Sequence, residues 1–516
     1  MHSFILTWLV ELISWLSLGN VLICITAGLS VWFWLISAAN GKKHPPLPGP
    51  YRIPYLGSVF VFSSFLSPLR RHKTQVDFAK YYGPICAIQV GKMQVVLLNS
   101  IEMVKEAFIT KGEYLSDRAP DMGVANMAKG IARENYGKDF KEKKKLTLHS
   151  MKDFGLGGKS LDETVREEVQ FLVQDFKKEA NTGVSTDIHQ RTIYLAVSNV
   201  ICSVVFGRRF PYDDEKFIQA VNSIKYLLSQ GTRNLQRIPV LRNLPFVKRK
   251  VAERAYQFGI IKNFIHDQIR KHKEDFDGDD PKDFVDLCLQ QEGAQVEGGK
   301  KSSVDTENLK RIIFDLFIAG TDTTAASLSW FILYMMHFPE VQRKCQEEID
   351  RVSETAGGFG GLTGSNLPYT TATLLETQRI SSIAGSSLPH FAREDTVLGE
   401  YHVKKGSIVQ ANIRFLHMDD RYWEAPEVFS PGRWLDPTDP SRIVQHSQFI
   451  PFSIGKRRCL GENLAKTEYT VFGITLLRYF SFRMEDSSRP PTLVGRGLVY
   501  SPLPYRMLVE ERNCND

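Results

Sequence analysis

The chain contains 516 residues, of which 43% are hydrophobic and 24% charged, so it has enough apolar material for a large buried core. The formal net charge is +7 and no long run of one sign occurs, which argues against a nucleic-acid-binding protein. Seven scattered cysteines without C-x-x-C pairs predict neither a disulfide scaffold nor a zinc module, and they fit a reducing compartment.

The first 44 residues are expected to anchor the chain in a membrane. No residue between Glu11 and Lys42 is charged, and Val21 to Ala39 is long enough as a helix to cross a hydrocarbon core of about 30 Å. A cleaved signal peptide is the alternative, but the start lacks a basic region and the apolar stretch is long. Because Lys42 and Lys43 follow at once, the positive-inside rule predicts a single-pass anchor with the rest of the chain in the cytosol. Whether residues 1–18 form a separate membrane segment is left open by the sequence.

Residues 45–50 (PPLPGP) predict a stiff, extended hinge, because proline fixes φ and lacks the N–H that a helix needs. No linker-like change in composition follows, so residues 51–516 are expected to form one catalytic domain. Residues 85–99 have alternating β-branched runs split by Gly91-Lys92, which predicts a β-hairpin. Helical periodicity dominates after Ile101. The predicted class is therefore mainly α with a small β region (α+β).

The most informative stretch runs from Phe452 to Gly461 and leads into an apolar, helix-like segment. A thiolate just before a helix start meets N–H groups and the positive end of the helix dipole, so Cys459 is placed to bind a metal as an anion. Gly455 can take the positive φ of a tight turn, and Gly461 lets backbone approach a flat macrocycle. Phe452 can pack beneath that macrocycle, and Arg457 can meet a carboxylate. A buried structural cysteine in a basic turn is the alternative.

These residues read F-x-x-G-x-R-x-C-x-G, which resembles the heme-binding signature of the cytochrome P-450 (heme-thiolate) superfamily. The resemblance implies the cytochrome P-450 fold with an N-terminal transmembrane helix, heme b (iron protoporphyrin IX) as the cofactor, and Cys459 as the ligand of the iron. It covers nearly the whole chain after Pro50. Residues 198–210 and 367–370 resemble the animal microsomal branch of xenobiotic and steroid hydroxylases.

A second motif, AGTDTT, lies in the middle of a long apolar helical stretch, residues 308–334. Glycine and threonine both weaken a buried helix, so their presence here departs from ordinary helix preferences. Such a departure indicates either a kink in the helix or a functional site. The motif resembles that of the superfamily's central helix, which implies that Ala319 and Gly320 border the heme. In the same resemblance Thr323 hydrogen-bonds dioxygen and Asp322 relays protons, which makes these two the candidate catalytic residues. A helix with a polar stripe is the alternative.

A buried ion-pair cluster is expected below the heme. Glu376 and Arg379 lie three residues apart on one helix face and can pair. Residues 426–434 resemble the superfamily's P-x-x-F-x-P-x-R-W segment, which implies that Arg433 joins them in a structural role. If the cluster is buried, removing one partner would leave an unpaired charge that costs about 3–5 kcal/mol.

The heme propionates require cations, and Arg457 is the first candidate. His390 stands where animal microsomal relatives carry a propionate-contacting histidine; a surface histidine is the alternative. The superfamily's W-x-x-x-R helix corresponds here to Phe140 and Lys144. Since phenylalanine donates no N–H and lysine cannot bind a carboxylate bidentately, weaker anchoring is expected at this edge. The surplus lysines there suit docking of an acidic electron donor, or they form a solvated face.

The resemblance implies a monooxygenase that inserts one oxygen atom from O2 into an apolar lipid, steroid or xenobiotic. NADPH–cytochrome P-450 reductase would supply the electrons, cytochrome b5 is a further candidate partner, and the endoplasmic reticulum membrane is the expected location. One alternative is a reductase-independent isomerase or dehydratase of peroxides, against which the Asp322–Thr323 pair argues; the other is a non-enzymatic heme or gas-binding membrane protein. Substrate contacts are expected at Phe314, Phe317, Ala319, residues 386–388, Leu498 and Val499.

Overall fold

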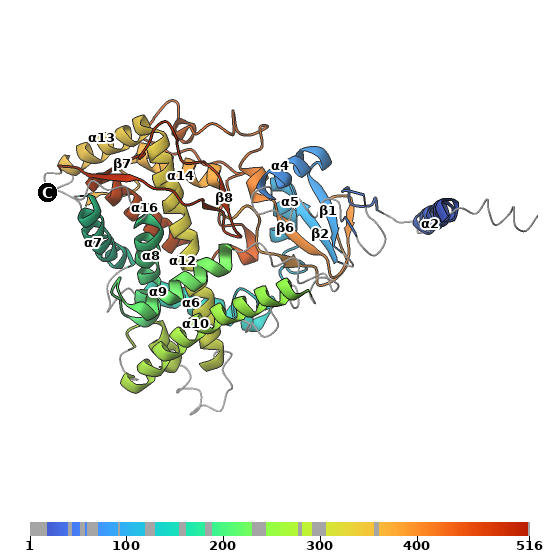
Figure 1. The fold of residues 1–516 in the computed structure, drawn as a ribbon, viewed down its shortest axis with the longest axis horizontal. Coiled ribbons are helices and arrows are strands. Elements are labelled where there is room, and N and C mark those ends of the chain that lie inside the picture. The colour runs from blue at the N-terminus through green and yellow to red at the C-terminus, as the bar shows by residue number, and fades with distance from the viewer. Residues whose placement is uncertain are drawn as a thin grey trace, which may run out of the picture. The chain divides into compact units, whose positions relative to one another are not determined.

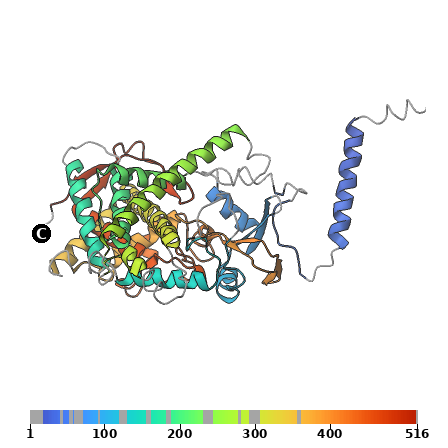
Figure 2. The same ribbon diagram turned by 90° about the horizontal axis from the view of Figure 1, so that it is seen from below.

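The computed structural model describes residues 18–39, 44–51, 57–58, 71–90, 93–118, 130–153, 161–180, 188–229, 244–276, 281–290, 306–355 and 361–513. Two units are distinguished, and each is treated by itself. One contains the N-terminal helix α2 (Leu18–Ala39), and the other comprises residues 47–398 and 403–516 (Figures 1 and 2). Within α2, the large apolar side chains described between Ile23 and Trp32 are exposed.

The second unit is mostly helical, which confirms the predicted class. Its α-helices are α4 (Arg71–Tyr82), α5 (Ile101–Lys105), α6 (Lys138–Asp153), α7 (Leu161–Ala180), α8 (Ile188–Phe206), α9 (Glu215–Ser229), α10 (Pro245–Asp275), α12 (Thr306–His337), α13 (Pro339–Thr355), α14 (Pro368–Ser381), α15 (Ile413–Leu416) and α16 (Glu462–Tyr479). A π-helical turn, η1 (Glu106–Thr110), continues α5, and two 3-10 turns are η6 (Pro431–Trp434) and η7 (Gly455–Arg457).

The β region is small, as the sequence predicts. One sheet has the order β1-β2-β6-β3, formed by Ile85–Val90, Met93–Leu98, Ile408–Ala411 and His390–Phe391. β1 and β2 pair antiparallel, with Ile85 opposite Leu98, which confirms the predicted hairpin strands; the connecting Gly91-Lys92 lies outside the described residues. β6 is parallel to β2 and antiparallel to β3. The other strands are β4 (Thr396–Leu398), β5 (Tyr401–Val403), β7 (Phe480–Arg483), β8 (Gly495–Arg496), β9 (Ser501–Pro502) and β10 (Leu508–Glu511), with β7 on β10 and β8 on β9.

The core is built around α12, which runs through the helical part of the unit (Figure 1). This helix packs against α8, α9, α10, α14 and α16, and nearly all of its C-terminal half is buried. Within the described residues, α12 is the one helix long and apolar enough to cross a membrane. Most of its apolar stretch is covered by protein, however, so α12 is a core helix.

The second half of the proline-rich segment packs on the sheet. The Ala87 amide of β1 donates to the Pro48 carbonyl at 2.7 Å. Gly49 lies so close to the Ala87 carbonyl that a Cβ there would overlap it, so only glycine fits. Leu47 is buried as well. The chain is therefore tied to the catalytic body from Leu47 onward.

Candidate active site

The cysteine loop is closed by its own backbone. The Cys459 amide donates to the Phe452 carbonyl at 3.0 Å, and the Gly461 amide donates to the Cys459 sulfur. α16 begins immediately afterwards at Glu462, as the sequence predicts. Burial raises the pKa of the Cys459 thiol, and the amide of Gly461 opposes that rise. The residue is nevertheless accessible to solvent. A metal cation at this sulfur would favour the thiolate.

Gly455 has the predicted positive φ, +80°, and its position admits no side chain. A Cβ at this residue would overlap the carbonyl oxygen of Phe108 in η1. The Phe108 ring in turn stacks on the His390 ring, with 3.8 Å between centroids. Phe108 therefore connects the cysteine loop to His390, a link between distant segments that sequence reasoning missed. By contrast, a Cβ on Gly461 would meet open space.

Arg457 reaches only backbone carbonyl groups among the described residues. Its guanidinium donates to Ser116 at 2.8 Å, to Ile131 at 3.3 Å and to Glu134. Burial lowers the pKa of Arg457 to about 10. The Phe140 ring lies 3.8 Å from the guanidinium carbon, so this residue holds Arg457 by a cation–π contact in the place where the superfamily has tryptophan.

Three further basic side chains surround Arg457. Arg118 donates to the carbonyls of Ala132 at 3.0 Å and Pro389 at 2.9 Å, and burial followed by the charge of Arg457 lowers its pKa to about 9. His390 is buried and its Nδ1 lies 2.6 Å from the Leu115 carbonyl; burial and the charge of Arg118 hold its pKa well below the usual range.

Lys144, the third, donates to the Lys456 carbonyl at 3.4 Å, and its pKa is lowered by burial and by Arg457. The nearby carboxylate of Asp117 is already bound by both Nε and Nη2 of Arg393. Arg118, Lys144 and Arg457 are positive groups that repel one another, and within the described part of the chain none of them forms an ion pair with a carboxylate, so they are suited to bind anions. The two propionates of heme fit this donor set, and Arg118 is a member that the sequence did not reveal.

A small hollow lies between α12, α14, α16 and the cysteine loop. Thr323 and Phe452 both border it, as expected for the central-helix threonine and the loop phenylalanine. Ala319, one turn before Thr323, is exposed although it lies in the middle of the core helix, so it faces interior space too. The other lining residues are Thr324, Ser327, Gln378, Ser382, Ile383, Ala384, Ile413, His417, Pro451, Ala465 and Tyr469.

Gly320 faces away from Ala319. A Cβ at Gly320 would overlap the side chain of Ile201 in α8. The structure accounts for this glycine by close packing of α8 on α12, and its expected place beside the cofactor stays a prediction. Of the expected substrate contacts, Phe317 is fully buried and stacks on Phe264 of α10, whereas Phe314 is partly buried and contacts Phe258 of the same helix.

The two candidate catalytic residues point to different neighbours. The Thr323 hydroxyl donates to the Ala319 carbonyl at 2.7 Å, within the helix. Asp322 is buried and hydrogen-bonds the hydroxyl of Tyr194 in α8, which in turn hydrogen-bonds Ser501. Burial raises the pKa of Asp322 to about 7, against the opposing effects of Tyr194 and the charge of Lys225. Near neutral pH this carboxyl therefore exists in both protonation states.

A second buried acid, Glu468 of α16, lies next to the cavity wall. It is 1% exposed, it hydrogen-bonds the hydroxyl of the wall residue Thr324, and its Oε1 has no partner in the described part of the chain. Burial raises the pKa of Glu468 to about 8. The group is therefore mainly a neutral carboxylic acid at pH 7.

Glu468→Gln is expected to stabilise the protein at alkaline pH. Because the folded-state pKa lies above the ordinary value, the wild type loses stability as pH rises from about 4.5 through about 8, while the neutral amide does not. The gain in free energy of unfolding should grow by on the order of 4 kcal/mol between pH 5 and pH 9. Chemical denaturation at both pH values measures it; a constant difference would show that Glu468 is ionised in the fold.

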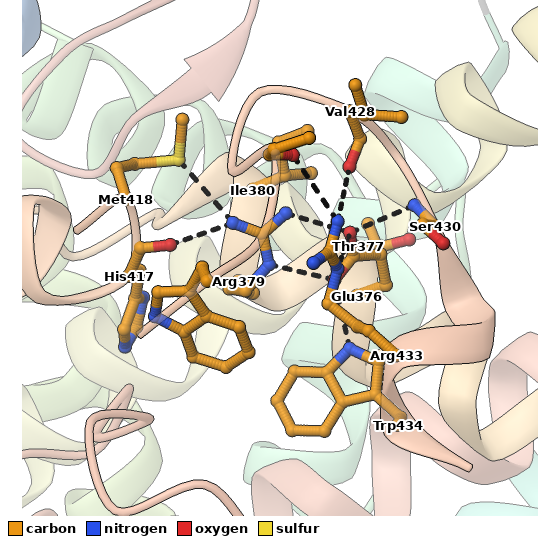
Figure 3. A network of polar contacts seen from close by, with 12 residues as sticks. Glu376, Thr377, Arg379, Ile380, His417, Met418, Val428, Ser430, Arg433 and Trp434 are labelled. Atoms are coloured by element: carbon orange, nitrogen blue, oxygen red, sulfur yellow. Dashed lines mark hydrogen bonds and ion pairs between the residues drawn. The ribbon is translucent and has the colours of Figure 1, made fainter. Parts of the chain in front are cut away.

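The predicted ion-pair cluster is confirmed (Figure 3). Glu376 and Arg379 are both 0% exposed, and Arg379 Nε and Nη2 each donate to a Glu376 oxygen at 2.8 Å. Arg433 Nε donates to Glu376 Oε1 at 3.1 Å, and the amide of Ser430 and the indole of Trp434 complete the set. Burial would raise the pKa of Glu376, but the Arg379 hydrogen bonds and charge outweigh it, so the pKa is lowered.

These features define a class of protein. An accessible cysteine directly before a helix, basic side chains near it, and a cavity beside the core helix α12 fit a heme-thiolate oxidoreductase. Residues 47–509 match the Cytochrome P450 family model. The chain is 33% identical to mouse Cytochrome P450 2U1, covering 96% of this chain and 95% of that protein. It is 34% identical to human Cytochrome P450 2J2 over 90% and 91%, and 31% identical to rat Cytochrome P450 2D26 over 96% and 100%. The chain therefore belongs to the cytochrome P450 family and is a heme-iron monooxygenase.

Proposed function

We propose that this enzyme is a membrane-anchored monooxygenase of the endoplasmic reticulum that hydroxylates an apolar substrate with electrons from NADPH–cytochrome P-450 reductase. The observation that carries the proposal is the position of Thr323 on the cavity wall with Asp322, a titratable acid, as its neighbour in the helix. Heme b bound by Cys459 would supply oxygen activation. Phe452, Gly455 and Gly461 would shape its proximal side, and Ala319 and Gly320 its distal side.

Residues of the chain would bind the heme propionates and deliver protons to the cavity. Arg118, His390, Lys144 and Arg457 would hold the propionates and fix the orientation of the cofactor. The Thr323 hydroxyl would donate a hydrogen bond into the cavity after turning from the Ala319 carbonyl. Asp322 would receive a proton through the hydroxyls of Ser501 and Tyr194 and pass it toward the cavity.

The anchor and the redox partner are supported by exposed groups. In α2, side chains such as Leu29 and Trp32 present apolar surface that suits a bilayer. On α6, Lys138, Lys141 and Lys145 are exposed, and Arg458 of the cysteine loop is exposed as well. A basic surface of this kind would attract an acidic flavoprotein or cytochrome b5.

Reconstitution of the purified enzyme with reductase in lipid vesicles tests the proposal. NADPH and oxygen consumption coupled to a hydroxylated product is expected across part of a lipid, steroid and xenobiotic panel. Product from peroxides without reductase would instead identify an isomerase or dehydratase. Spectral binding without any turnover would identify a heme or gas-binding protein.

Asp322→Asn should slow product formation by roughly 10²-fold, because the amide cannot pass a proton. Thr323→Ala should keep NADPH consumption but divert it to hydrogen peroxide, because the hydroxyl in the cavity is lost. Ser329→Ala removes a hydroxyl of the same helix that donates to the Ala325 carbonyl, and Ser329 is not among the described residues that line the cavity, so it serves as the control. The product formed per NADPH measures the effect; equal values in the wild type, T323A and S329A would contradict the assignment.

A further inference from the structure

Three side chains of metal-binding types meet where α10 ends and the next helix, residues 284–290, begins. His272 lies in the last turn of α10, Asp283 directly precedes the next helix, and Asp286 lies in its first turn. One imidazole nitrogen and one oxygen from each carboxylate all lie within 4.8 Å of one another. None of these three residues is among the described residues that line the cavity.

The His272 ring is oriented by a backbone carbonyl group. Its Nδ1 lies 3.0 Å from the Gln268 carbonyl oxygen, which can only accept a hydrogen bond, so Nδ1 carries a proton. Its Nε2 faces the Asp283 carboxylate at 2.7 Å. A histidine that binds a metal through one ring nitrogen almost always donates from the other to a carbonyl or carboxylate group. His272 is therefore held as such a ligand is held, with Nε2 directed to the two carboxylates.

The cluster carries more negative charge than His272 can neutralise. Asp283 Oδ1 accepts the Asp286 amide at 2.9 Å, and Asp286 Oδ2 accepts the Lys282 amide at 3.1 Å. Burial and the charge of Asp283 raise the pKa of Asp286, against the opposing charges of His272 and Lys282. A proton on the imidazole ring supplies one positive charge for two carboxylates, whereas a divalent cation neutralises both.

The surroundings of the cluster leave room for an ion. Gly207, which directly follows α8, has a φ of +60°, and a Cβ there would lie 2.8 Å from Asp283 Oδ2. Gln268 is 4% exposed, and its Oε1 bonds no group of the described residues. Because Gln268 and His272 lie four residues apart on one face of α10, this oxygen is available to a water molecule bound on the ion.

We propose that His272, Asp283 and Asp286 bind one zinc ion, which connects the end of α10 to the helix that follows. Zinc accepts a histidine nitrogen together with carboxylate oxygens, whereas calcium and magnesium prefer oxygen alone. In a tetrahedral site, bonds of ~2.1 Å place the ligand atoms about 3.4 Å apart. That spacing falls between the 2.7 Å of the His272–Asp283 pair and the 4.8 Å limit of the whole set. This structural site lies beyond the proposed function and does not depend on it.

Zinc titration of the tag-free, heme-loaded full-length enzyme tests this after EDTA has removed bound metal. Calorimetry should show one zinc ion per chain, with magnesium and calcium bound at least about tenfold more weakly. Asp286→Asn keeps an oxygen for the Lys282 amide but removes the ligand charge, and it should weaken zinc binding at least about tenfold, as should His272→Gln. His266→Gln and Asp267→Asn change neighbouring residues of α10 outside the cluster and should leave the zinc affinity unchanged.

X-ray absorption at the zinc edge identifies the ligands in the wild type without any variant, so a variant that fails to fold does not affect it. A first shell of one imidazole and oxygen atoms, without sulfur, is expected. A sulfur neighbour, the absence of zinc binding, or an unchanged affinity in heme-loaded D286N and H272Q would overturn the proposal. Neither measurement requires reductase or turnover, so the result does not depend on the monooxygenase reaction.

Discussion

Cys459→Ala is expected to abolish the red-shifted Soret band of the reduced carbon-monoxide complex, together with all monooxygenase activity. The band requires a thiolate on the iron, and Cys459 is the described cysteine that a backbone amide, that of Gly461, hydrogen-bonds directly before a helix. Difference spectra of purified protein, normalised to total heme, measure the result. A persisting band would show that another residue binds the iron.

Cys345→Ala is the matched control. Cys345 is buried in α13 and contacts the Thr373 hydroxyl, and burial raises its pKa to about 12, so it remains a thiol. Cys202 and Cys86 are buried in the same way, and burial raises the pKa of each. C345A should keep the full Soret band even if the alanine lowers stability, because the Cys345 thiol is enclosed in the core, whereas Cys459 is accessible.

The parts of the site that could be predicted from sequence are those encoded by neighbouring residues. The loop from Phe452 to Gly461 carries its turn, its thiol and its helix start within ten positions, so the positive φ of Gly455 and the start of α16 followed directly. The same holds for the β1–β2 pairing and for Glu376 with Arg379, which are three residues apart on one helix.

The parts that could not be predicted depend on contacts between distant segments. Arg118 reaches the site through the fold, and nothing in its neighbouring sequence marks it as a cation that lies beside Arg457. Tyr194 reads as one more apolar residue of α8, yet its hydroxyl is the partner of Asp322. The helical pattern of α16 indicates that the Glu468 side chain points into the core. Its protonation state, however, depends on how completely the surrounding residues bury the carboxyl group.

Gly320 is a residue whose role could not be predicted from the sequence for a different reason. Within the AGTDTT motif a glycine suggests open space for a ligand, but glycine also permits two helices to approach closely. The structure shows the second use, because Ile201 of α8 occupies the place of a side chain. A glycine that makes room for a ligand and a glycine that permits close helix packing look the same in a single sequence. Ala319 and Thr323, four residues apart, share the accessible face instead.

Glu376→Gln is expected to destabilise the fold by about 3–5 kcal/mol, the cost of leaving a buried charge without its partner. The amide keeps the size of the side chain but removes the charge that neutralises Arg379, which is fully buried. Arg379 cannot turn outward, since its Nη1 also holds the His417 carbonyl at 2.8 Å. Because His417 borders the cavity, the variant should also retain less heme. Chemical denaturation and the heme-to-protein ratio measure the two effects.

Glu347→Gln is the control, because Glu347 pairs with Arg343 on the exposed face of α13 and should contribute less than about 1 kcal/mol. Acidification separates a charge effect from lost packing. The pKa of Glu376 is held below its ordinary value, so its contribution is present above that value and is lost as pH falls through the folded-state pKa. The difference between wild type and E376Q should therefore narrow below about pH 4.5. A difference that stays constant there would mean that Glu376 acts by shape and hydrogen bonds alone, and that hydrogen bonds to carbonyl groups suffice to stabilise the two arginines.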